Sequence, residues 1–447
     1  MWGRRLPGTM ISDRILEHPE LLLLKRPAAH GPAGADPEIA ARVSEILLAI
    51  ERGGEPELRR VSRELDGWDP PSFELTRAQI DAAERHVEPE LRRHLQLGRD
   101  RTEAFARAQR ATLSELEHEV APGVVAGHRL VPVASVGAYL PAGRVPLLAS
   151  PFMTVLVPKV AGVETVVACA PPHRGEGIFP SLVYSTAISG ADRIFALGGV
   201  QALAAMAFGL AGMDEVDMIV GAGNAYVAEA KRQLYGRVGI DLLAGPSEVA
   251  VIADDTADPE LVAADLLGQA EHGPTSPVAL VTTSEELGRA VRAEVERQLE
   301  ELGSREVAGA AWRDHGGIVV ARDRETAAWV SDELAPEHLE VQTSDDAWFH
   351  ARLRNYGSIF LGPRATVAYS DKGTTGTNHV LPTARAARYT AGLSVARFLK
   401  PLTFQRIDSD AATGAIGEAV VAISATESLP GHGATAAKRL ERKELAA

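Results

Sequence analysis

The spacing of hydrophobic residues along the chain predicts a helical beginning. Over residues 40–114, apolar side chains recur at intervals of three and four residues among many Arg and Glu residues, as at Leu91, Leu95 and Phe105. That interval places apolar side chains on one face of an α-helix. We therefore expect helices through this segment, each with one face buried against the rest of the protein.

A different pattern over residues 131–253 predicts parallel strands separated by helices. Short runs of apolar and β-branched residues alternate there with alanine-rich stretches of helical spacing. Such alternation favours βαβ units in a parallel sheet, in which ligands bind at the carboxyl ends of the strands. The expected strands are residues 154–157, 165–168, 193–197 and 217–220.

The second half of the chain predicts another α/β unit. A long helical pattern covers residues 254–272, a buried strand is expected at residues 278–281, and a charged amphipathic helix is expected over residues 285–302. Residues 435–447 form a charged, helix-like tail that suits packing against a partner. The hydrophobic pattern as a whole therefore predicts the α/β class.

Size and charge narrow the classes of function. The chain has 447 residues, 45% of them hydrophobic and 24% charged, which is an ordinary globular composition and long enough for two or three domains. Its formal net charge of −14 at pH 7 argues against nucleic acid or an anionic membrane as the main partner, because both bind basic surfaces. No apolar run approaches the roughly 20 residues that span a bilayer, so we expect a soluble, cytoplasmic protein.

The single cysteine, Cys169, excludes a disulfide within the chain and a metal site built from cysteines. It lies in an apolar run typical of a buried strand, where a neutral thiol packs as a small hydrophobic side chain. A cysteine-dependent aldehyde dehydrogenase with this thiol as nucleophile is an alternative. Because no neighbouring Lys, Arg or His would lower the pKa of the thiol, packing is the favoured interpretation.

Two polar residues near the middle of the chain suggest a metal site. Gln269 and His272 stand three residues apart in a helical pattern, so their side chains would share one helix face and could hold one metal ion. Taken alone, this spacing favours a surface glutamine beside a capping histidine. The interpretation therefore depends on further ligands elsewhere in the chain.

Two later segments combine carboxylates with imidazoles. Glu337 and His338 are adjacent in a segment that begins with proline, which favours a loop that presents a general acid/base pair. The glycine-punctuated stretch over residues 369–379 carries Asp371 and His379 without hydrophobic periodicity. Because a loop of this kind contributes little to the hydrophobic core, its polar side chains are candidate catalytic or ligand-binding groups.

A third carboxylate and imidazole, Glu427 and His432, lie in a turn-like context near the end of the chain. Nitrogen and oxygen ligands suit zinc, whose catalytic sites leave coordination positions open. The candidate ligands are Gln269, His272, Asp371 and His432.

Together these segments resemble the histidinol dehydrogenase family over residues 24–439. The blocks that carry the resemblance stand in the order typical of that family: Ala-Gly-Pro-Ser-Glu at 244–248, Gln-Ala-Glu-His at 269–272, Pro-Glu-His at 336–338, Gly-Thr-Asn-His-Val-Leu-Pro-Thr at 376–383, and Glu427 followed by His432. The resemblance implies an NAD-dependent enzyme that oxidises a small primary alcohol through an aldehyde to a carboxylate. Histidinol, in histidine biosynthesis, is the family's default substrate.

The resemblance also implies a zinc site shared between two subunits. Gln269, His272 and Asp371 match the family's zinc ligands from one subunit, with one zinc ion per subunit. His432 matches the ligand that the partner subunit donates. The implied assembly is an intertwined homodimer with shared active sites.

Further roles follow from the same resemblance. His338 matches the general base that removes the proton of the alcohol, and Glu337 matches the carboxylate that activates water for attack on the aldehyde. Ser247, His379 and Glu427 match groups that contact the substrate, as do His338 and the zinc ligands. A neutral imidazole near its ordinary pKa of about 6.5 is suited to accept the proton.

The dinucleotide signal is incomplete when it is taken alone. The run from Gly221 to Tyr226 follows an expected strand and opens an expected helix, but it lacks the third glycine of the Rossmann fingerprint. The family resemblance implies an atypical, Rossmann-like NAD site. Its expected contacts are Tyr139, Gln201 and Asn224.

The resemblance implies two Rossmann-like, parallel-sheet domains with extensions at both ends. Residues 1–38 would form the N-terminal extension. A first, discontinuous α/β domain would comprise residues 39–124 and 245–382, and a cofactor-side domain residues 125–244. Residues 383–447 would form the C-terminal dimerisation extension. Residues 1–9 look like a loose stretch ahead of a start at Met10.

Several positions depart from the family pattern and leave the substrate open. Ala142 and Ala222 stand where glycine and proline are expected, and the loop from Asp371 to His379 is one residue longer, with Lys372 where tyrosine is usual. These departures are similar to a paralogous branch that includes sulfopropanediol 3-dehydrogenases, which oxidise a sulfonated diol. Arginines that could bind a sulfonate, or that are solvated surface charges instead, are Arg385, Arg388 and Arg397.

A non-catalytic binding protein on the same scaffold is an alternative from another class. Such a protein would be expected to lose its general base or a metal ligand. Because every such position is filled in this sequence, an enzyme is favoured.

Overall fold

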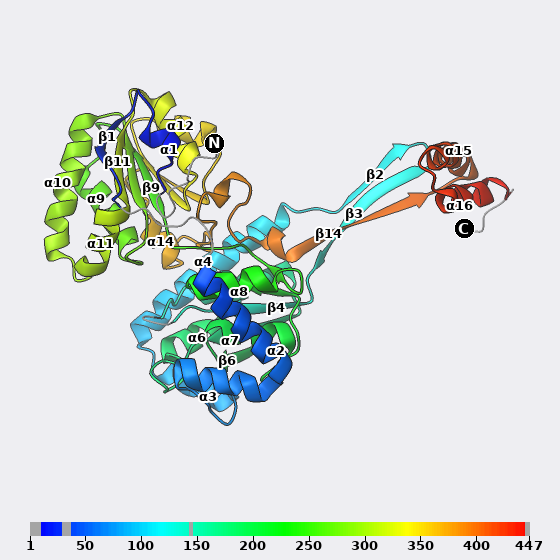
Figure 1. Cartoon of the computed structure of the whole chain (residues 1–447), viewed down its shortest axis with the longest axis horizontal. Coiled ribbons are helices and arrows are strands. Elements are labelled where there is room, and N and C mark those ends of the chain that lie inside the picture. Colours follow the sequence, from blue (N-terminus) through cyan, green and yellow to red (C-terminus); the bar gives the residue numbers. More distant parts are fainter. Residues whose placement is uncertain (1–9, 29–36, 143–145, 443–447) are drawn as a thin grey trace.

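The computed structural model describes residues 10–28, 37–142 and 146–442. In Figure 1 these residues form two α/β bodies, each built on a mainly parallel sheet, and a long arm that projects away from both bodies. The expected α/β class with parallel sheets is confirmed. Residues 1–9 lie outside the described part of the chain. No helix within the described ranges is both long and apolar enough to cross a membrane.

The first body contains a five-stranded parallel sheet of strand order β6-β5-β4-β7-β8. The strands are β4 (Ser135–Tyr139), β5 (Thr165–Ala170), β6 (Arg193–Ala196), β7 (Met218–Val220) and β8 (Gly239–Ile240). Helices α6 (Pro180–Ile188), α7 (Gly199–Phe208) and α8 (Ala225–Leu234) connect the strands from β5 onward. Strands with both faces covered are continuously apolar, which explains why three of them were predictable.

The strand expected at residues 154–157 is wrong. This run lies in helix, across η1 (Phe152–Leu156) and α5 (Val157–Ala161). Every side chain from Phe152 to Pro158 is buried, so the hydrophobic pattern has no period that would distinguish a helix from a strand. Pro158 lies directly after the π-helical turn, in the first turn of α5.

The helices expected at the beginning of the chain are α2 (Pro37–Asp66), α3 (Arg77–Arg85) and α4 (Pro89–Ala111). They pack on the first body: α2 contacts α7 and α8, α3 contacts α6, and α4 contacts α5. The apolar stripe of α2 at Val43, Ile46 and Ile50 joins the core that holds the alanine-rich helix α7. This placement differs from the expected grouping of residues 39–124 with residues 245–382.

The second body contains a six-stranded sheet of order β1-β11-β10-β9-β12-β13. Its parallel strands are β9 (Val249–Ala253), β10 (Val278–Thr282), β11 (Gly316–Val320), β12 (His338–Gln342) and β13 (Ser358–Leu361). Strand β1 (Leu22–Lys25), within the expected N-terminal extension, pairs antiparallel with β11 at the edge. The segment around β1 is therefore part of this body.

Two helical layers cover the six-stranded sheet. Val249 and Val251 of β9 face the core formed with α9 (Pro259–Ala270), α10 (Glu285–Glu301) and α11 (Arg305–His315). Ala250 and Ile252 face the opposite core, formed with α1 (Asp13–Leu16), α12 (Arg324–Leu334) and α13 (Asp346–Arg352). Successive side chains of a strand point to opposite faces, so one apolar run supplies both cores.

The arm is a three-stranded antiparallel sheet that ends in a helical hairpin (Figure 1). Its strands are β2 (Leu116–Ala121), β3 (Val124–Pro132) and β14 (Leu399–Ile407), and its helices are α15 (Asp410–Thr426) and α16 (Pro430–Leu440). Every residue of β2 is exposed, and large apolar side chains such as Val120, Leu402 and Ile423 face solvent. The helix expected over residues 435–447 is present as the C-terminal part of α16, and residues 443–447 lie outside the described ranges.

Candidate active site

A cleft of about 440 Å³ brings most of the candidate residues together. Residues of the first body line one side of it, and residues of the second body line the other. The candidates among the lining residues are Tyr139, Ser247, His272, Glu337, His338, Asp371 and His379.

The cleft uses opposite edges of the two sheets. Tyr139 ends β4 and Ala222 follows β7, so the five-stranded sheet contributes the carboxyl ends of its strands, as expected. His338 opens β12 and Ser247 precedes β9, so the six-stranded sheet contributes amino ends instead. The carboxyl ends expected for the strands of the first body thus face amino ends from the second body. Strands β9 and β12 are parallel neighbours, which places the residues ahead of them at the same edge.

The contacts of Nδ1 fix the orientation of the His338 ring. Nδ1 lies 3.0 Å from the carbonyl oxygen of Glu248 and 3.4 Å from Oε2 of Glu337. Among the residues that the structure describes, Nε2 has no hydrogen-bond partner, and it lies 3.8 Å from Oδ1 of Asp371. Since a neutral imidazole that donates from Nδ1 keeps its lone pair on Nε2, the free nitrogen can accept a proton.

Charges around the imidazole decide its protonation. Burial alone would lower the pKa of His338, but the Glu337 and Asp371 carboxylates and the Glu248 carbonyl together raise this pKa to about 9. In the absence of any added cation, the imidazole is therefore protonated at neutral pH. A positive charge placed beside these carboxylates would weaken that effect and favour the neutral ring.

Glu337 and Glu248 lie beside the histidine and are joined to each other by a hydrogen bond. Oε2 of Glu337 accepts the backbone N–H of Glu248 at 2.8 Å, and Oε1 of Glu248 accepts the N–H of Ala384 at 2.9 Å. Burial raises the pKa of the Glu248 carboxyl to about 8, so this group is largely uncharged at neutral pH. Glu248 stands in the block that led to Ser247, but sequence reasoning assigned it no role.

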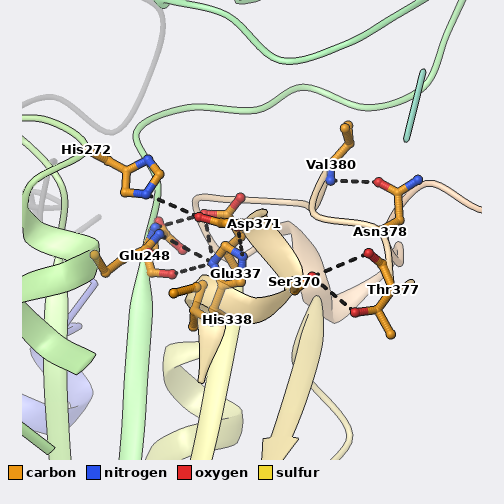
Figure 2. A network of polar contacts seen from close by, with 12 residues as sticks. Glu248, His272, Glu337, His338, Ser370, Asp371, Thr377, Asn378 and Val380 are labelled. Carbon is orange, nitrogen blue, oxygen red and sulfur yellow. Dashed lines mark hydrogen bonds and ion pairs between the residues drawn. The ribbon is translucent and has the colours of Figure 1, made fainter. Parts of the chain in front are cut away.

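The side chains of His272 and Asp371 point toward each other, as Figure 2 shows. Nε2 of His272 lies 3.2 Å from Oδ2 of Asp371, which closes the short helix α14 (Val367–Asp371). Burial opposes ionisation of Asp371, but the hydrogen bond from His272 and the imidazoles of His379 and His338 hold the pKa of this carboxyl well below its usual value. The pair therefore offers an anionic oxygen and an imidazole nitrogen to one ligand.

Gln269 reaches the same place, although not from the expected shared helix face. Helix α9 ends at Ala270, so only Gln269 is helical, and His272 lies in the turn beyond the cap. Nε2 of Gln269 is 3.5 Å from Nδ1 of His338. The turn after the helix, rather than helical spacing, brings the two side chains into one site.

These donors fit part of a zinc site. An amide oxygen, an imidazole nitrogen and a carboxylate oxygen suit zinc chemically. Within the described ranges, however, no group of three or more His, Cys, Asp and Glu residues is arranged to hold a metal ion. The fourth expected ligand, His432, does not line the cleft of its own chain.

The loop after α14 is held by its own hydrogen bonds. The hydroxyl groups of Ser370 and Thr377 are 3.1 Å apart, and Asn378 Oδ1 accepts the N–H of Val380 at 2.8 Å (Figure 2). These hydrogen bonds hold the segment on either side of His379, which lines the cleft. Burial lowers the pKa of His379 and favours its neutral form.

The chain is similar to known proteins over most of its length. A family model described as histidinol dehydrogenase matches residues 31–440. The chain belongs to the histidinol dehydrogenase family. Members of this family are NAD-dependent oxidoreductases that act on CH–OH groups, and this chain is an enzyme of that class.

Individual relatives cover nearly the whole chain. A histidinol dehydrogenase homolog from Shouchella clausii is 48% identical, across 91% of this chain and 95% of the relative. A sulfopropanediol 3-dehydrogenase from Ruegeria pomeroyi is 44% identical, across 91% and 93%. The crystal structure of histidinol dehydrogenase from Elizabethkingia anophelis superposes with a TM-score of 0.87 at 32% identity and covers 92% of this chain and 94% of that chain.

Of the three residues that the family resemblance assigned to NAD, only Tyr139 lines the cleft. The hydroxyl group of Tyr139 accepts the N–H of Gly199 at 3.2 Å. Gln201 is buried and donates to Asp66 at 2.7 Å, while Asn224 caps helix α8 through two backbone N–H groups. Sequence reasoning missed Asp66, because no local pattern distinguishes the last residue of a long, charged helix.

Glu427 and His432 do not reach the cleft of their own chain. Glu427 caps the end of α15 and His432 lies in the first turn of α16, both exposed at the tip of the arm (Figure 1). Cys169, in contrast, is fully buried in β5, and burial raises the pKa of its thiol to about 12. Cys169 is therefore a packing residue, and a cysteine-dependent mechanism has no nucleophile here.

Proposed function

We propose that this chain is a zinc- and NAD-dependent dehydrogenase that converts a small primary alcohol through an aldehyde to a carboxylate. The observation that carries this proposal is the position of His338, which lines the cleft and whose Nε2 has no hydrogen-bond partner in the described structure, while Glu337 lies beside the ring. A base and a carboxylate side by side suit two successive oxidations.

The two oxidations make different demands on the pair. In the first, Nε2 of His338 would take the hydroxyl proton, and NAD⁺, when bound, would accept the hydride of the carbinol carbon. In the second, Glu337 takes a proton from water, whose oxygen attacks the aldehyde carbon, and the hydrate then loses a second hydride. The balance is RCH2OH, two NAD⁺ and water giving RCOO⁻, two NADH and three protons.

Gln269, His272 and Asp371 would hold the zinc ion, together with His432 of the partner subunit. When bound, zinc would orient the substrate and polarise its oxygen. The chemistry of these donors and the contact between His272 and Asp371 support this assignment. The positive charge would also lower the pKa of the neighbouring imidazole, as a general base requires.

The five-stranded sheet would bind NAD. Its strands run outward from β4 in one direction to β6 and in the other through β7 to β8, which is the arrangement of a mononucleotide-binding half with its switch point between β4 and β7. Tyr139 and the turn at Gly221 lie at that point. Gln201 and Asn224 would take part from the ends of α7 and α8.

The exposed surface of the arm supports the proposal that the chain forms a homodimer. The arm projects from both bodies and carries exposed apolar side chains, and its tip bears Glu427 and His432. A second copy of the chain would cover these apolar side chains and would gain two polar groups for its own cleft. Each active site would then be completed by the partner.

The substrate is histidinol or a small sulfonated diol, and one observation favours the diol. The three arginines considered as sulfonate ligands do not line the cleft: Arg385 binds Glu333, Arg388 binds the Arg385 carbonyl and Arg397 binds the Ile240 carbonyl. Lys372 does line the cleft, and no described residue forms an ion pair with it. An ammonium group there would attract a sulfonate.

Production of NADH from alcohols of different charge tests the proposal. Purified enzyme is supplied with zinc, NAD⁺ and either L-histidinol, 2,3-dihydroxypropane-1-sulfonate or an uncharged diol. We expect two NADH per molecule of the preferred alcohol and a carboxylate product. A stoichiometry of one NADH, with aldehyde accumulating, would contradict the assignment of Glu337.

A further inference from the structure

A buried ion pair lies directly behind the wall of the cleft. Lys231 of α8 and Asp241, which follows β8, are 1% and 2% exposed, and the ammonium nitrogen of Lys231 is hydrogen bonded to Oδ1 of Asp241. Neither residue lines the cleft, and sequence reasoning assigned neither a role. A fully desolvated pair is expensive to bury, so its remaining hydrogen bonds indicate what it does.

Both residues hold the backbone of Gly221. Lys231 Nζ donates to the Gly221 carbonyl oxygen at 2.8 Å, and the Gly221 N–H donates to Oδ2 of Asp241 at 2.7 Å. Gly221 has a φ of +116°, and a Cβ atom there would lie 2.2 Å from the carbonyl oxygen of Tyr139. The turn after β7 is therefore pressed against the end of β4 and fixed from behind by the ion pair.

The same pair holds a second wall of the cleft. Oδ1 of Asp241 also accepts the N–H of Leu242 at 2.6 Å, at the start of the segment 242–247. Three residues of this segment line the cleft: Ala244, Gly245 and Ser247. The turn that begins at Gly221 contributes Ala222 to the opposite, cofactor side.

We propose that Lys231 and Asp241 are positioning residues that hold the cofactor-side turn and the substrate-side segment in one fixed arrangement. The inference rests on the proposed function for the identity of the two ligands, but its geometry does not. Hydrogen bonds to charged groups are among the stronger ones in a protein interior, and here at least three of them bind loop backbone. Release of these bonds would leave both segments free to sample non-binding conformations, which lowers affinity.

The double variant Lys231→Met/Asp241→Leu tests the proposal. Apolar side chains of similar volume often replace a buried ion pair without loss of stability, so positioning can be separated from folding. We expect a thermal midpoint close to that of wild type, faster amide hydrogen exchange at residues 221–224 and 242–247, and a roughly tenfold weaker Kd for NAD⁺ measured by calorimetry. The control is Lys159→Met/Asp192→Asn, which removes a more exposed ion pair of the same body.

The outcomes distinguish this proposal from the proposed function. Unchanged exchange and unchanged affinity in a folded double variant would overturn the proposal. If the double variant does not fold, amide hydrogen exchange in the wild type tests the proposal instead. The amides of Gly221 and Leu242 should then be as protected as those of neighbouring strands. Exchange at the rate typical of turns would overturn the proposal. A wild-type enzyme that binds no NAD⁺ would contradict the proposed function, while the exchange comparison would still decide the positioning role.

Discussion

The carbonyl oxygen of Glu248 lies 3.0 Å from Nδ1 of His338, and Nε2 of the same ring, 3.8 Å from Oδ1 of Asp371, has no hydrogen-bond partner among the described residues. Because the carbonyl accepts but cannot donate, it selects the ring tautomer with a proton on Nδ1. The contact comes from the residue just ahead of β9, so the pairing of β9 with β12 fixes the geometry of the base.

The first prediction separates the two oxidations. His338→Asn should slow the oxidation of alcohol and aldehyde alike, by about 10² to 10⁴, because both steps need a base near the reacting carbon. Glu337→Gln keeps an oxygen that can accept the Glu248 N–H, so it should chiefly slow aldehyde oxidation. NADH formation is measured with alcohol or aldehyde supplied directly, and the exposed His350→Asn is the control. An equal loss on both substrates in the Glu337 variant would refute its assignment as water activator.

The second prediction concerns the buried carboxyl of Glu248. Its pKa is about 8 in the folded chain, against an ordinary value of 4.5. Between these values the unfolded chain releases a proton that the folded chain retains, so rising pH favours unfolding, and the effect saturates above about pH 8. At about 1.4 kcal/mol per pKa unit, the contribution is on the order of a few kcal/mol.

Glu248→Gln tests that contribution, because the amide imitates the protonated acid and cannot ionise. Between about pH 5 and 8, the folded and unfolded states of wild type differ in the number of bound protons. The thermal midpoint of the variant should therefore fall less steeply over this range than that of wild type. The exposed Glu300→Gln should follow wild type. Parallel curves for all three proteins would show that Glu248 ionises normally in the folded state.

The third prediction concerns metal content. Enzyme dialysed against metal-free buffer should retain about one zinc ion per subunit, and His272→Ala/Asp371→Asn should lose it, because the variant removes two of the proposed ligands. Elemental analysis measures zinc, and His94→Ala, which alters the same cleft, is the matched control. Full zinc occupancy in the double variant would place the metal elsewhere.

The fourth prediction addresses the substrate. Lys372→Met should raise the KM for 2,3-dihydroxypropane-1-sulfonate by roughly tenfold, the equivalent of one charge-assisted hydrogen bond, and should leave the KM for an uncharged diol unchanged. Arg388→Met, outside the cleft, should change neither value. If wild type prefers histidinol and the Lys372 variant behaves like wild type on every alcohol, recognition of a sulfonate by Lys372 is excluded.

The sequence predicted the site better than the positions of the elements around it. Asp371 was found because polar groups in a segment without periodicity have little structural use, and His338 because it adjoins a carboxylate in a segment that begins with proline; both line one cleft. The helical run after Phe152 was mistaken for a strand, because complete burial removes the period that identifies either structure. The role of Lys231 could not be predicted, because it depends on a contact with Asp241 that only the packing of α8 beside β8 creates.

The last prediction tests whether each active site draws on two chains. His272→Ala and His432→Ala should each be inactive alone, since each removes a proposed zinc ligand from every site of its own homodimer. A heterodimer of the two would contain one doubly damaged site and one site with every ligand intact. Statistical exchange gives about half heterodimers, so roughly a quarter of wild-type activity should return on mixing. Exchange is verified with differently tagged subunits, and a mixture of His272→Ala with itself is the control. Verified heterodimers without activity would mean that His432, at the tip of the arm, serves no zinc site in a partner.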